Sequence, residues 1–166
     1  RYGKNRSRTT VGQRQQDAMQ QTMRLSKISG LQASEKASIL ARGPIQKAIY
    51  GTEISYTSKA DISKFKTQSK KAINMRWENA APEIALAGLH GIQTDIHAMI
   101  IWRRITTAKR LMTIQLEFAL MWDEALRVYS PSTQKLYGPF SLLFRSFEDL
   151  MWTPLPGGKV EVPTWG

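Results

Sequence analysis

The sequence predicts an all-α protein, a helical bundle of about six helices, on three observations. Apolar residues recur every three to four positions in several segments, as they do on the buried face of a helix. Serine, threonine or aspartate stands where several of these segments begin, and glycine or proline stands near their ends. The alternation of apolar and polar residues that is typical of half-buried strands is almost absent.

The first third of the chain predicts a basic arm and two helices. Residues 1–12 are polar, basic and without periodicity, so we expect a flexible arm. A helix is expected from Gln13, with Gly30 at its C-terminal stop. Ser34 is expected to cap a second helix. Pro44 should end or kink that helix, because proline removes a backbone donor and its ring clashes with the preceding turn.

The middle of the chain contains the clearest helix signal. Residues 50–57 are rich in β-branched and aromatic residues and leave open a short strand or a loop. Ser58 is followed three residues later by Asp61, which resembles a capping box, and a lysine-rich helix follows. A short apolar helix is expected to begin at Pro82 and to stop near Gly91.

The last third predicts one long helical stretch, a final helix and a tail. Thr94 and Asp95 are expected to cap the stretch over residues 96–128, either as one helix or as two with a bend near the β-branched pair Thr106-Thr107. Pro139 begins the final helix. The tail, residues 153–166, has three prolines and two adjacent glycines and is expected to be extended.

Length and charge suggest how the chain is organised. Its 166 residues fit one helical domain, residues 13–152, between the arm and the tail. The formal charge is +11, from 24 Lys and Arg against 13 Asp and Glu. Residues 1–110 hold 20 basic and 7 acidic residues, whereas residues 111–166 hold 4 and 6. The domain thus has a basic part, 13–110, and a near-neutral part, 111–152. We expect a polyanion to bind the first two thirds.

Composition excludes several classes of site. The chain has no cysteine, which excludes disulfides, thiolate metal sites and cysteine nucleophiles and leaves the cytosol, the nucleus and organelle interiors open. Its longest apolar run, Ala98 to Trp102, is too short for a transmembrane span. A chain that begins at Arg1 is expected to be a processed product or an internal fragment. The acid-free basic stretch at residues 1–16 also fits the end of an organellar transit peptide.

No pattern predicts a self-sufficient active site. His90 and His97 are separated by a helix stop and a cap, and no third metal ligand stands near them in sequence. The acidic pairs at 123–124 and 148–149 are neighbours, which point in different directions on a helix. No glycine loop for phosphate and no serine-triad motif is found. We expect the chain on its own to be no enzyme and to need no cofactor or metal.

Two basic clusters form the candidate binding site, with the arm as a third basic segment. The first cluster follows the lysine-rich helix, where no acid occurs between Asp61 and Glu78, and the second follows the long helix. Trp77 and Trp102 stand beside arginines and could stack on bases, although such residues are more often core anchors. The predicted phosphate contacts are Lys59, Lys64, Lys66, Lys70, Lys71, Arg76, Arg103, Arg104, Lys109 and Arg110.

The order of several short motifs resembles a known family. Residues 48–53 read Ala-Ile-Tyr-Gly-Thr-Glu, the serine-capped lysine-rich helix follows, and then come Ala-Pro-Glu-Ile at 81–84 and an aspartate-capped long helix at Asp95. This order resembles the region just downstream of the catalytic palm in reverse transcriptase-like proteins of non-LTR (LINE-type) retrotransposons. The resemblance covers about residues 14–111.

The resemblance implies a helical thumb or connector that holds a template–primer duplex, with Lys64, Lys66, Lys70 and Lys71 as its contacts. The metal-binding aspartates of such polymerases belong to the palm, and no Asp-Asp pair occurs in this chain. No catalytic residue is therefore carried over. The chain would be at most a fragment of an RNA-directed DNA polymerase that lacks the catalytic aspartates.

These observations leave one leading hypothesis and two alternatives. The leading hypothesis is a noncatalytic module that binds duplex or structured nucleic acid through backbone phosphates. The first alternative is a structural subunit of a larger protein assembly, organellar or not, that docks through its aromatic C-terminal third and its tail. The second is binding to an anionic membrane surface through the lysine-rich helix.

Overall fold

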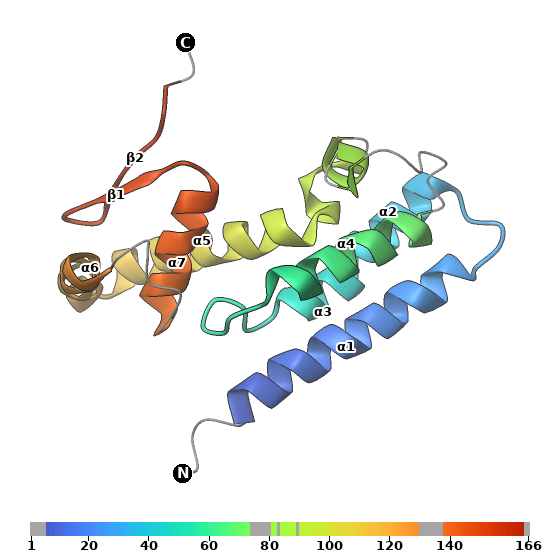
Figure 1. Cartoon of the computed structure of the whole chain (residues 1–166), viewed down its shortest axis with the longest axis horizontal. Helices are drawn as coiled ribbons and strands as arrows, with labels where there is room; N and C mark the ends of the chain where they lie inside the picture. The colour runs from blue at the N-terminus through green and yellow to red at the C-terminus, as the bar shows by residue number, and fades with distance from the viewer. Residues whose placement is uncertain (1–5, 74–80, 83, 89, 130–137, 165–166) are drawn as a thin grey trace. The chain divides into compact units, whose positions relative to one another are not determined.

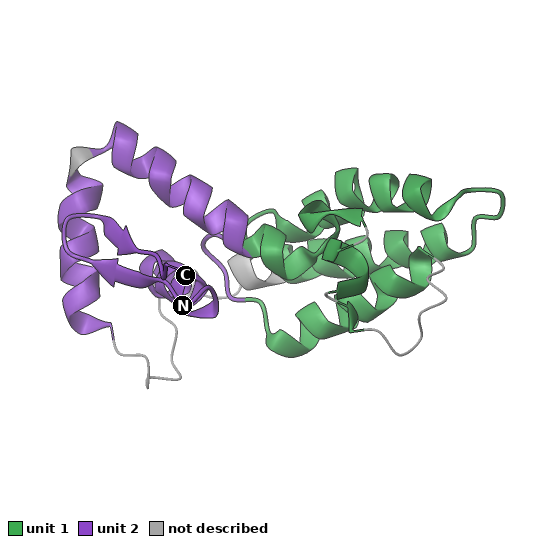
Figure 2. Ribbon diagram, turned by 90° about the horizontal axis from the view of Figure 1, so that it is seen from above, with its two compact units in different colours: residues 1–52, 57–100 green, residues 53–56, 101–166 purple. Residues whose placement is uncertain are grey.

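The chain is all-α, as predicted. The computed structural model describes residues 6–73, 81–82, 84–88, 90–129 and 138–164, which contain seven α-helices and one two-stranded sheet (Figure 1). The helices and strands fall into two compact units where the sequence predicted a single helical domain (Figure 2). Unit 1 comprises residues 1–52 and 57–100, and unit 2 comprises residues 53–56 and 101–166.

Unit 1 is built mainly from four helices. They are α1 (Arg6–Ser26), α2 (Ala33–Arg42), α3 (Pro44–Ile49) and α4 (Lys59–Ala72). Helix α1 packs against α3 and α4, and α2 packs against α3. Burial of apolar side chains between these helices stabilises the unit. Its core includes Ala18, Leu25, Leu40, Ile45, Ile49, Phe65, Ile73, Leu86 and Ile100.

The ends of the first helices follow local signals only in part. Helix α1 already begins at Arg6, so the second half of the predicted flexible arm is helical, and residues 1–5 lie outside the described part of the chain. The predicted cap at Ser34 is wrong, because α2 begins at Ala33 and its N-cap is Gln32. The Glu35 carboxylate accepts a hydrogen bond from the Gln32 backbone amide at 2.7 Å. Pro44 separates α2 from α3 as predicted.

The predicted N-cap of α4 at Ser58 is confirmed, although Asp61 bonds to the Ser58 side chain and not to its backbone amide as in a full capping box. The Ser58 hydroxyl oxygen accepts a hydrogen bond from the Asp61 amide at 3.1 Å, and the hydroxyl donates to Asp61 Oδ2 at 2.6 Å. Residues 50–57 form turns and not a strand. After α4, a π-helical turn at Ile84–Gly88 and a 3₁₀ turn at Ile92–Thr94 lead to α5.

The long helical stretch is two helices, but the predicted bend is misplaced. Helix α5 (Ile96–Ile114) passes through Thr106 without interruption, and the Thr106 hydroxyl donates back to the Trp102 carbonyl at 2.8 Å. The break comes at Gln115, whose φ of −125° and ψ of 106° are extended. Helix α6 (Leu116–Val128) follows, and its Trp122 lies in the core of unit 2.

Unit 2 has an aromatic core between α6 and α7 (Gly138–Asp149). Trp122 is 1% exposed and meets the ring of Phe144 edge-on, with ring centres 5.0 Å apart. The indole Nε1 donates to the Leu155 carbonyl at 2.9 Å. This bond reaches into the tail and ties it to the core.

The tail is a hairpin, which corrects the predicted extended segment. Strand β1 (Thr153–Leu155) pairs antiparallel with β2 (Lys159–Glu161), with Pro154 opposite Val160. Gly157 and Gly158 in the turn have φ values of 70° and 73°, which glycine adopts at no steric cost. The segment 129–137, which contains Pro131 and is predicted to be a loop, lies outside the described residues except for Tyr129.

Two glycines of unit 1 should respond to alanine in opposite ways. A Cβ at Gly12, inside α1, would meet no atom within 4 Å, so Gly12→Ala should raise the free energy of unfolding by about 0.5–1 kcal/mol. Gly51 has a φ of +87°, and a Cβ there would lie 3.0 Å from Val11 Cγ2. Gly51→Ala should lower the free energy of unfolding by about 1–2 kcal/mol. Urea denaturation of both variants checks this pair, and shifts of the same sign would contradict it.

Candidate nucleic-acid interface

The net positive charge of the chain belongs almost entirely to unit 1. Unit 1 holds 16 basic and 6 acidic residues, whereas unit 2 holds 8 and 7. The net charges are therefore +10 and +1. Unit 1 is the part of the molecule to which electrostatics would draw a polyanion.

The acidic groups described in unit 1 are all engaged within the unit. Asp17 Oδ2 lies 3.2 Å from Lys47 Nζ, and hydrogen bonds from Lys47 and Gln13 lower the pKa of Asp17. Glu35 and Asp61 serve as helix caps, and Asp95 is buried in an ion pair. The two remaining acids of unit 1, at 78 and 83, lie outside the described residues. The engaged acids leave exposed lysines of α4 without an ion pair inside the described part of the unit.

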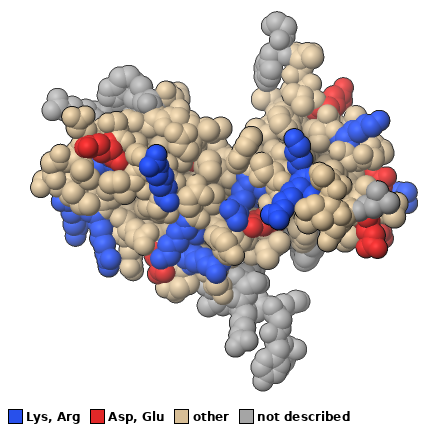
Figure 3. Space-filling view, turned by 180° about the vertical axis from the view of Figure 1, so that it is seen from behind, with Lys and Arg blue, Asp and Glu red and all other residues tan. Residues whose placement is uncertain are grey.

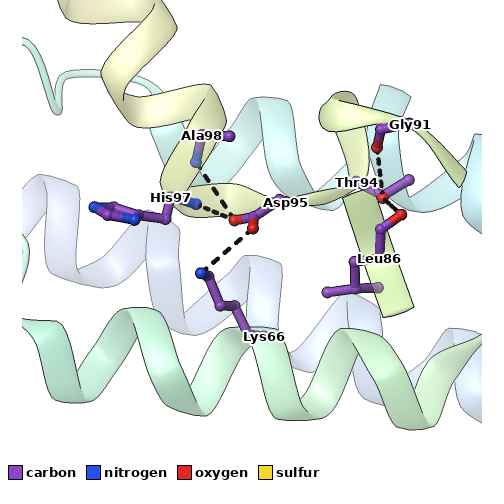
Figure 4. Close-up of polar contacts among 7 residues, drawn as sticks. All are labelled: Lys66, Leu86, Gly91, Thr94, Asp95, His97 and Ala98. Atoms are coloured by element: carbon purple, nitrogen blue, oxygen red, sulfur yellow. Dashed lines mark hydrogen bonds and ion pairs between the residues drawn. The ribbon is translucent and has the colours of Figure 1, made fainter. Parts of the chain in front are cut away.

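The buried ion pair joins α4 to the start of α5. Lys66 Nζ lies 3.3 Å from Asp95 Oδ2, and each side chain is only 7% exposed. The other oxygen, Asp95 Oδ1, accepts hydrogen bonds from the His97 amide at 2.8 Å and the Ala98 amide at 3.4 Å (Figure 4). Asp95 therefore caps α5, as predicted. Lys66 holds the interior together and is not on the outer cationic face, so its prediction as an outward-facing lysine is wrong.

The other residue of the predicted double cap has a different role. The Thr94 hydroxyl lies 2.8 Å from both the Leu86 carbonyl and the Gly91 carbonyl (Figure 4). These bonds tie the 3₁₀ turn to the π-helical turn before it. Thr94 thus fixes the approach of the chain to Asp95, while Asp95 alone caps the helix.

The other predicted phosphate contacts of the first cluster differ in how far their side chains are exposed to solvent. Lys59, Lys64 and Lys71 are exposed, Lys70 is half-buried, and Arg76 lies outside the described residues. Lys64 and Lys71 are seven positions apart and therefore lie on the same side of the helix, about two turns from each other. Figure 3 shows the molecule from behind, with Lys and Arg side chains spread over its surface and a few Asp and Glu side chains among them. The structure thus places three of the six first-cluster residues at the surface.

The second cluster lies in unit 2 and is partly committed to internal contacts. Arg103 Nε lies 3.2 Å from Glu53 Oε2, and the Arg104 guanidinium donates to Ser146 Oγ at 3.2 Å. Burial lowers the pKa of Arg104 to about 10, so the group remains charged at pH 7. Only Lys109 and Arg110 of this cluster are exposed.

The tryptophans also differ from expectation. Trp102 is 61% exposed, so the interpretation that it anchors the core is wrong. It lies seven residues before Lys109 and thus on the same side of α5. Trp77 lies outside the described residues.

Sequence reasoning missed a groove between α1 and α4. Its volume is about 440 Å³, and both of its walls belong to unit 1. The α1 wall repeats at three- and four-residue spacing, which is a signal the sequence contained. The opposite wall was not predictable, because it comes from residues about 40 positions away. The groove is lined by Gly12, Gln15, Gln16, Met19, Gln20, Thr57, Asp61, Ile62, Lys64, Phe65 and Ile96.

The comparisons and the remaining site searches add no assignment. No protein-family model matches the chain, and neither the curated proteins nor the solved structures contain a match. Over the described residues, no group of three or more His, Asp or Glu side chains could hold a metal ion. Within the same residues, every helix is too short or too polar to cross a membrane. The class that fold and surface define is an all-α protein with a strongly cationic unit.

The buried ion pair predicts a large difference between two lysines of the same helix. Lys66→Met leaves Asp95 buried without its partner and should lower the free energy of unfolding by about 3–5 kcal/mol. Lys71→Met, at an exposed position, should change it by less than about 0.5 kcal/mol. Adding Asp95→Asn to Lys66→Met removes the unpaired charge and keeps a capping oxygen, so the double variant should be more stable than Lys66→Met alone. Chemical denaturation decides the order, and equal losses for Lys66→Met and Lys71→Met would contradict it.

Proposed function

We propose that the chain is a noncatalytic nucleic-acid-binding module that contacts backbone phosphates through unit 1. The observation that carries this proposal is the uncompensated charge of that unit. Its net charge is +10, its described acids are engaged internally, and Lys59, Lys64 and Lys71 are exposed on one helix. Lysines of this kind act as point charges on phosphate and supply affinity without reading sequence.

The spacing on α4 suits a regular polyanion. Seven residues of an α-helix rise by about 10 Å, which is the distance between Lys64 and Lys71 along the helix axis. Each strand of a nucleic acid duplex advances about 3.4 Å per nucleotide, so three nucleotides cover the same length. Because this advance is measured along the duplex axis, the two lysines can reach separate phosphates when α4 lies along that axis. Lys59, on another side of the helix, would contact a different phosphate.

The resemblance to retroelement reverse transcriptases gives this module a place in a larger protein. In such a protein the chain would be the thumb or connector, and its lysine-rich helix would lie along the template–primer duplex. The motif at 50–53 and the caps at Ser58 and Asp95 are the features on which this part of the proposal rests. The module would bind and position nucleic acid and leave catalysis to another domain.

A salt titration tests phosphate contact. The full chain should bind a mixed-sequence duplex in fluorescence anisotropy, and log K should fall steeply with log salt concentration. Lys59→Gln with Lys71→Gln should reduce the size of that slope by about 2, since each phosphate contact contributes about 0.9. The matched control is Arg127→Gln with Lys159→Gln, which removes two exposed cations from unit 2 and should leave the slope unchanged.

Two outcomes would overturn the proposed function. One is a wild-type chain that shows no salt-sensitive binding below about 10 μM, a dissociation constant in the middle of the range of ordinary non-specific binding. The other is an equal reduction of the slope by both double variants, which would mean that total charge and not the surface of unit 1 drives binding.

The alternative, a structural subunit that docks on protein, is favoured by one feature of unit 2. Three apolar side chains on α6 face solvent: Leu120 is 73% exposed, Met121 54% and Val128 80%. Met121 and Val128 are seven positions apart and lie on the same side of the helix. The hairpin tail, in contrast, is tied to the aromatic core. If the alternative holds, α6 and not the tail is the docking element.

Copurification tests the alternative. After nuclease treatment, the full chain should retain a stoichiometric protein partner, and Leu120→Lys with Val128→Lys should release it, because two charges in an apolar interface are left desolvated. Lys59→Gln with Lys71→Gln, which changes two exposed residues of unit 1, serves as the control here and should retain the partner. Retention of the same partner by the Leu120→Lys, Val128→Lys variant would exclude α6 as the docking face.

A further inference from the structure

The groove between α1 and α4 combines an apolar floor with a polar rim. Phe65 and Ile96 are buried at its base, and Met19 and Ile62 are half-buried along it. Its volume of about 440 Å³ falls in the range of small-molecule sites, which are mainly apolar with a few convergent polar groups. The floor alone would favour any flat apolar ligand, so the rim decides the class of ligand.

The α1 side of the rim is a row of amides. Gln15 is half-buried and its amide nitrogen donates to the Thr57 hydroxyl oxygen at 2.9 Å, which leaves its carbonyl oxygen as an acceptor. Gln16 and Gln20 are exposed, and neither amide bonds to another residue within the described part of the chain. Each of these two amides can donate and accept at once. Such pairs of donor and acceptor match the edge of a nucleobase.

The α4 side of the rim carries one charge of each sign. Asp61 Oδ2 accepts a hydrogen bond from Ser58, so this carboxylate is held at the first turn of α4. Lys64 follows three residues later and is exposed, with no ion pair among the described residues. An anionic group of a ligand would therefore lie at Lys64 and away from Asp61. A carboxylate such as that of Asp61 can also accept from an exocyclic amino group.

We propose that this groove binds a nucleotide with an unpaired base, the base against Met19 and Ile62 and the phosphate at Lys64. The three requirements of the groove are a flat apolar face, an edge with both donors and acceptors, and one anionic group, and a nucleotide meets all three. The inference rests on the proposed function, because a bound nucleic-acid strand would supply this nucleotide, either at a bulge or at a strand end. A free nucleoside monophosphate has the same chemistry and is the second source to test.

Titration of the full chain with nucleoside monophosphates tests the groove directly. In ¹H–¹⁵N NMR spectra, AMP, CMP, GMP and UMP should shift the side-chain amide signals of Gln16 and Gln20 and the backbone signal of Lys64. Ribose 5-phosphate, which lacks the base, and adenosine, which lacks the phosphate, should each bind at least about fivefold more weakly than AMP, as expected for the loss of one set of contacts.

Neighbouring residues on each helix provide matched variants. Gln20 lines the groove and Gln21 does not, although both are exposed on α1, so Gln20→Ala should weaken AMP binding about fivefold and Gln21→Ala should leave it unchanged. Lys64→Gln and Lys71→Gln form the same kind of pair on α4. Gly12→Leu places a side chain where a Cβ meets no atom within 4 Å, so it should occupy part of the groove and weaken AMP binding about fivefold without unfolding α1.

A bulge experiment separates the two sources and the two proposals. A duplex with a one-nucleotide bulge should bind about fivefold more tightly than a blunt duplex of the same sequence, and Gly12→Leu should remove that advantage.

If AMP binds but the bulge gives no advantage, the groove takes a free nucleotide. If the blunt duplex binds with the expected salt dependence and neither AMP nor the bulge affects the groove signals, the nucleotide site is overturned and the proposed function stands. If AMP binds and no duplex does, the proposed function fails and the nucleotide site remains.

Discussion

The arrangement of unit 1 depends on one buried ion pair. Removing two charged groups from water costs free energy, and the cost is offset only when the charges meet each other and their remaining bonding capacity is used. Lys66 and Asp95 satisfy this condition, since the second oxygen of Asp95 also caps α5 through the His97 and Ala98 amides. One carboxylate thus joins α4 to the start of α5. The pair fixes the rotation of α4 about its axis, with Phe65 inward and Lys64 and Lys71 outward.

The structural roles of the acidic side chains leave unit 1 with positive charge at its surface that no acid neutralises. Asp17, Glu35, Asp61 and Asp95 each serve a structural contact, so none of them neutralises an exposed lysine of α4. Clustered positive charge disfavours the compact state through self-repulsion. A folded unit that keeps this repulsion is favoured to bind a polyanion, because binding relieves the repulsion and releases counterions. The internal contacts of the acids and the cationic surface therefore have the same cause, which is the placement of the acidic residues in unit 1.

Local signals in the sequence predicted what depends on local chemistry. The cap at Ser58, the cap at Asp95 and the helix break at Pro44 all involve atoms within three residues of each other, and the structure confirms them. The cap at Ser34 and the start of α1 are errors in local signals, and the other errors concern partners that are distant in sequence. Lys66 looked like a surface lysine because Asp95 stands 29 residues later, and the tail forms a hairpin on an aromatic core assembled from α6 and α7. The groove escaped prediction for the same reason, since only its α1 wall is periodic.

The two roles of lysine on α4 follow from the helical period. With 100° per residue, Lys66 lies one position beyond Phe65 and beside Ser69, at the border of the buried face, whereas Lys64 and Lys71 lie on the opposite border. A border lysine can extend to water unless a neighbouring element covers it, and the turn that carries Asp95 covers Lys66. Which lysine becomes structural is thus decided by the neighbouring element and not by the lysine-rich segment itself. The basic run on α4 thus contains a structural lysine, Lys66, and exposed lysines such as Lys64 and Lys71, of which Lys64 also lies at the rim of the groove.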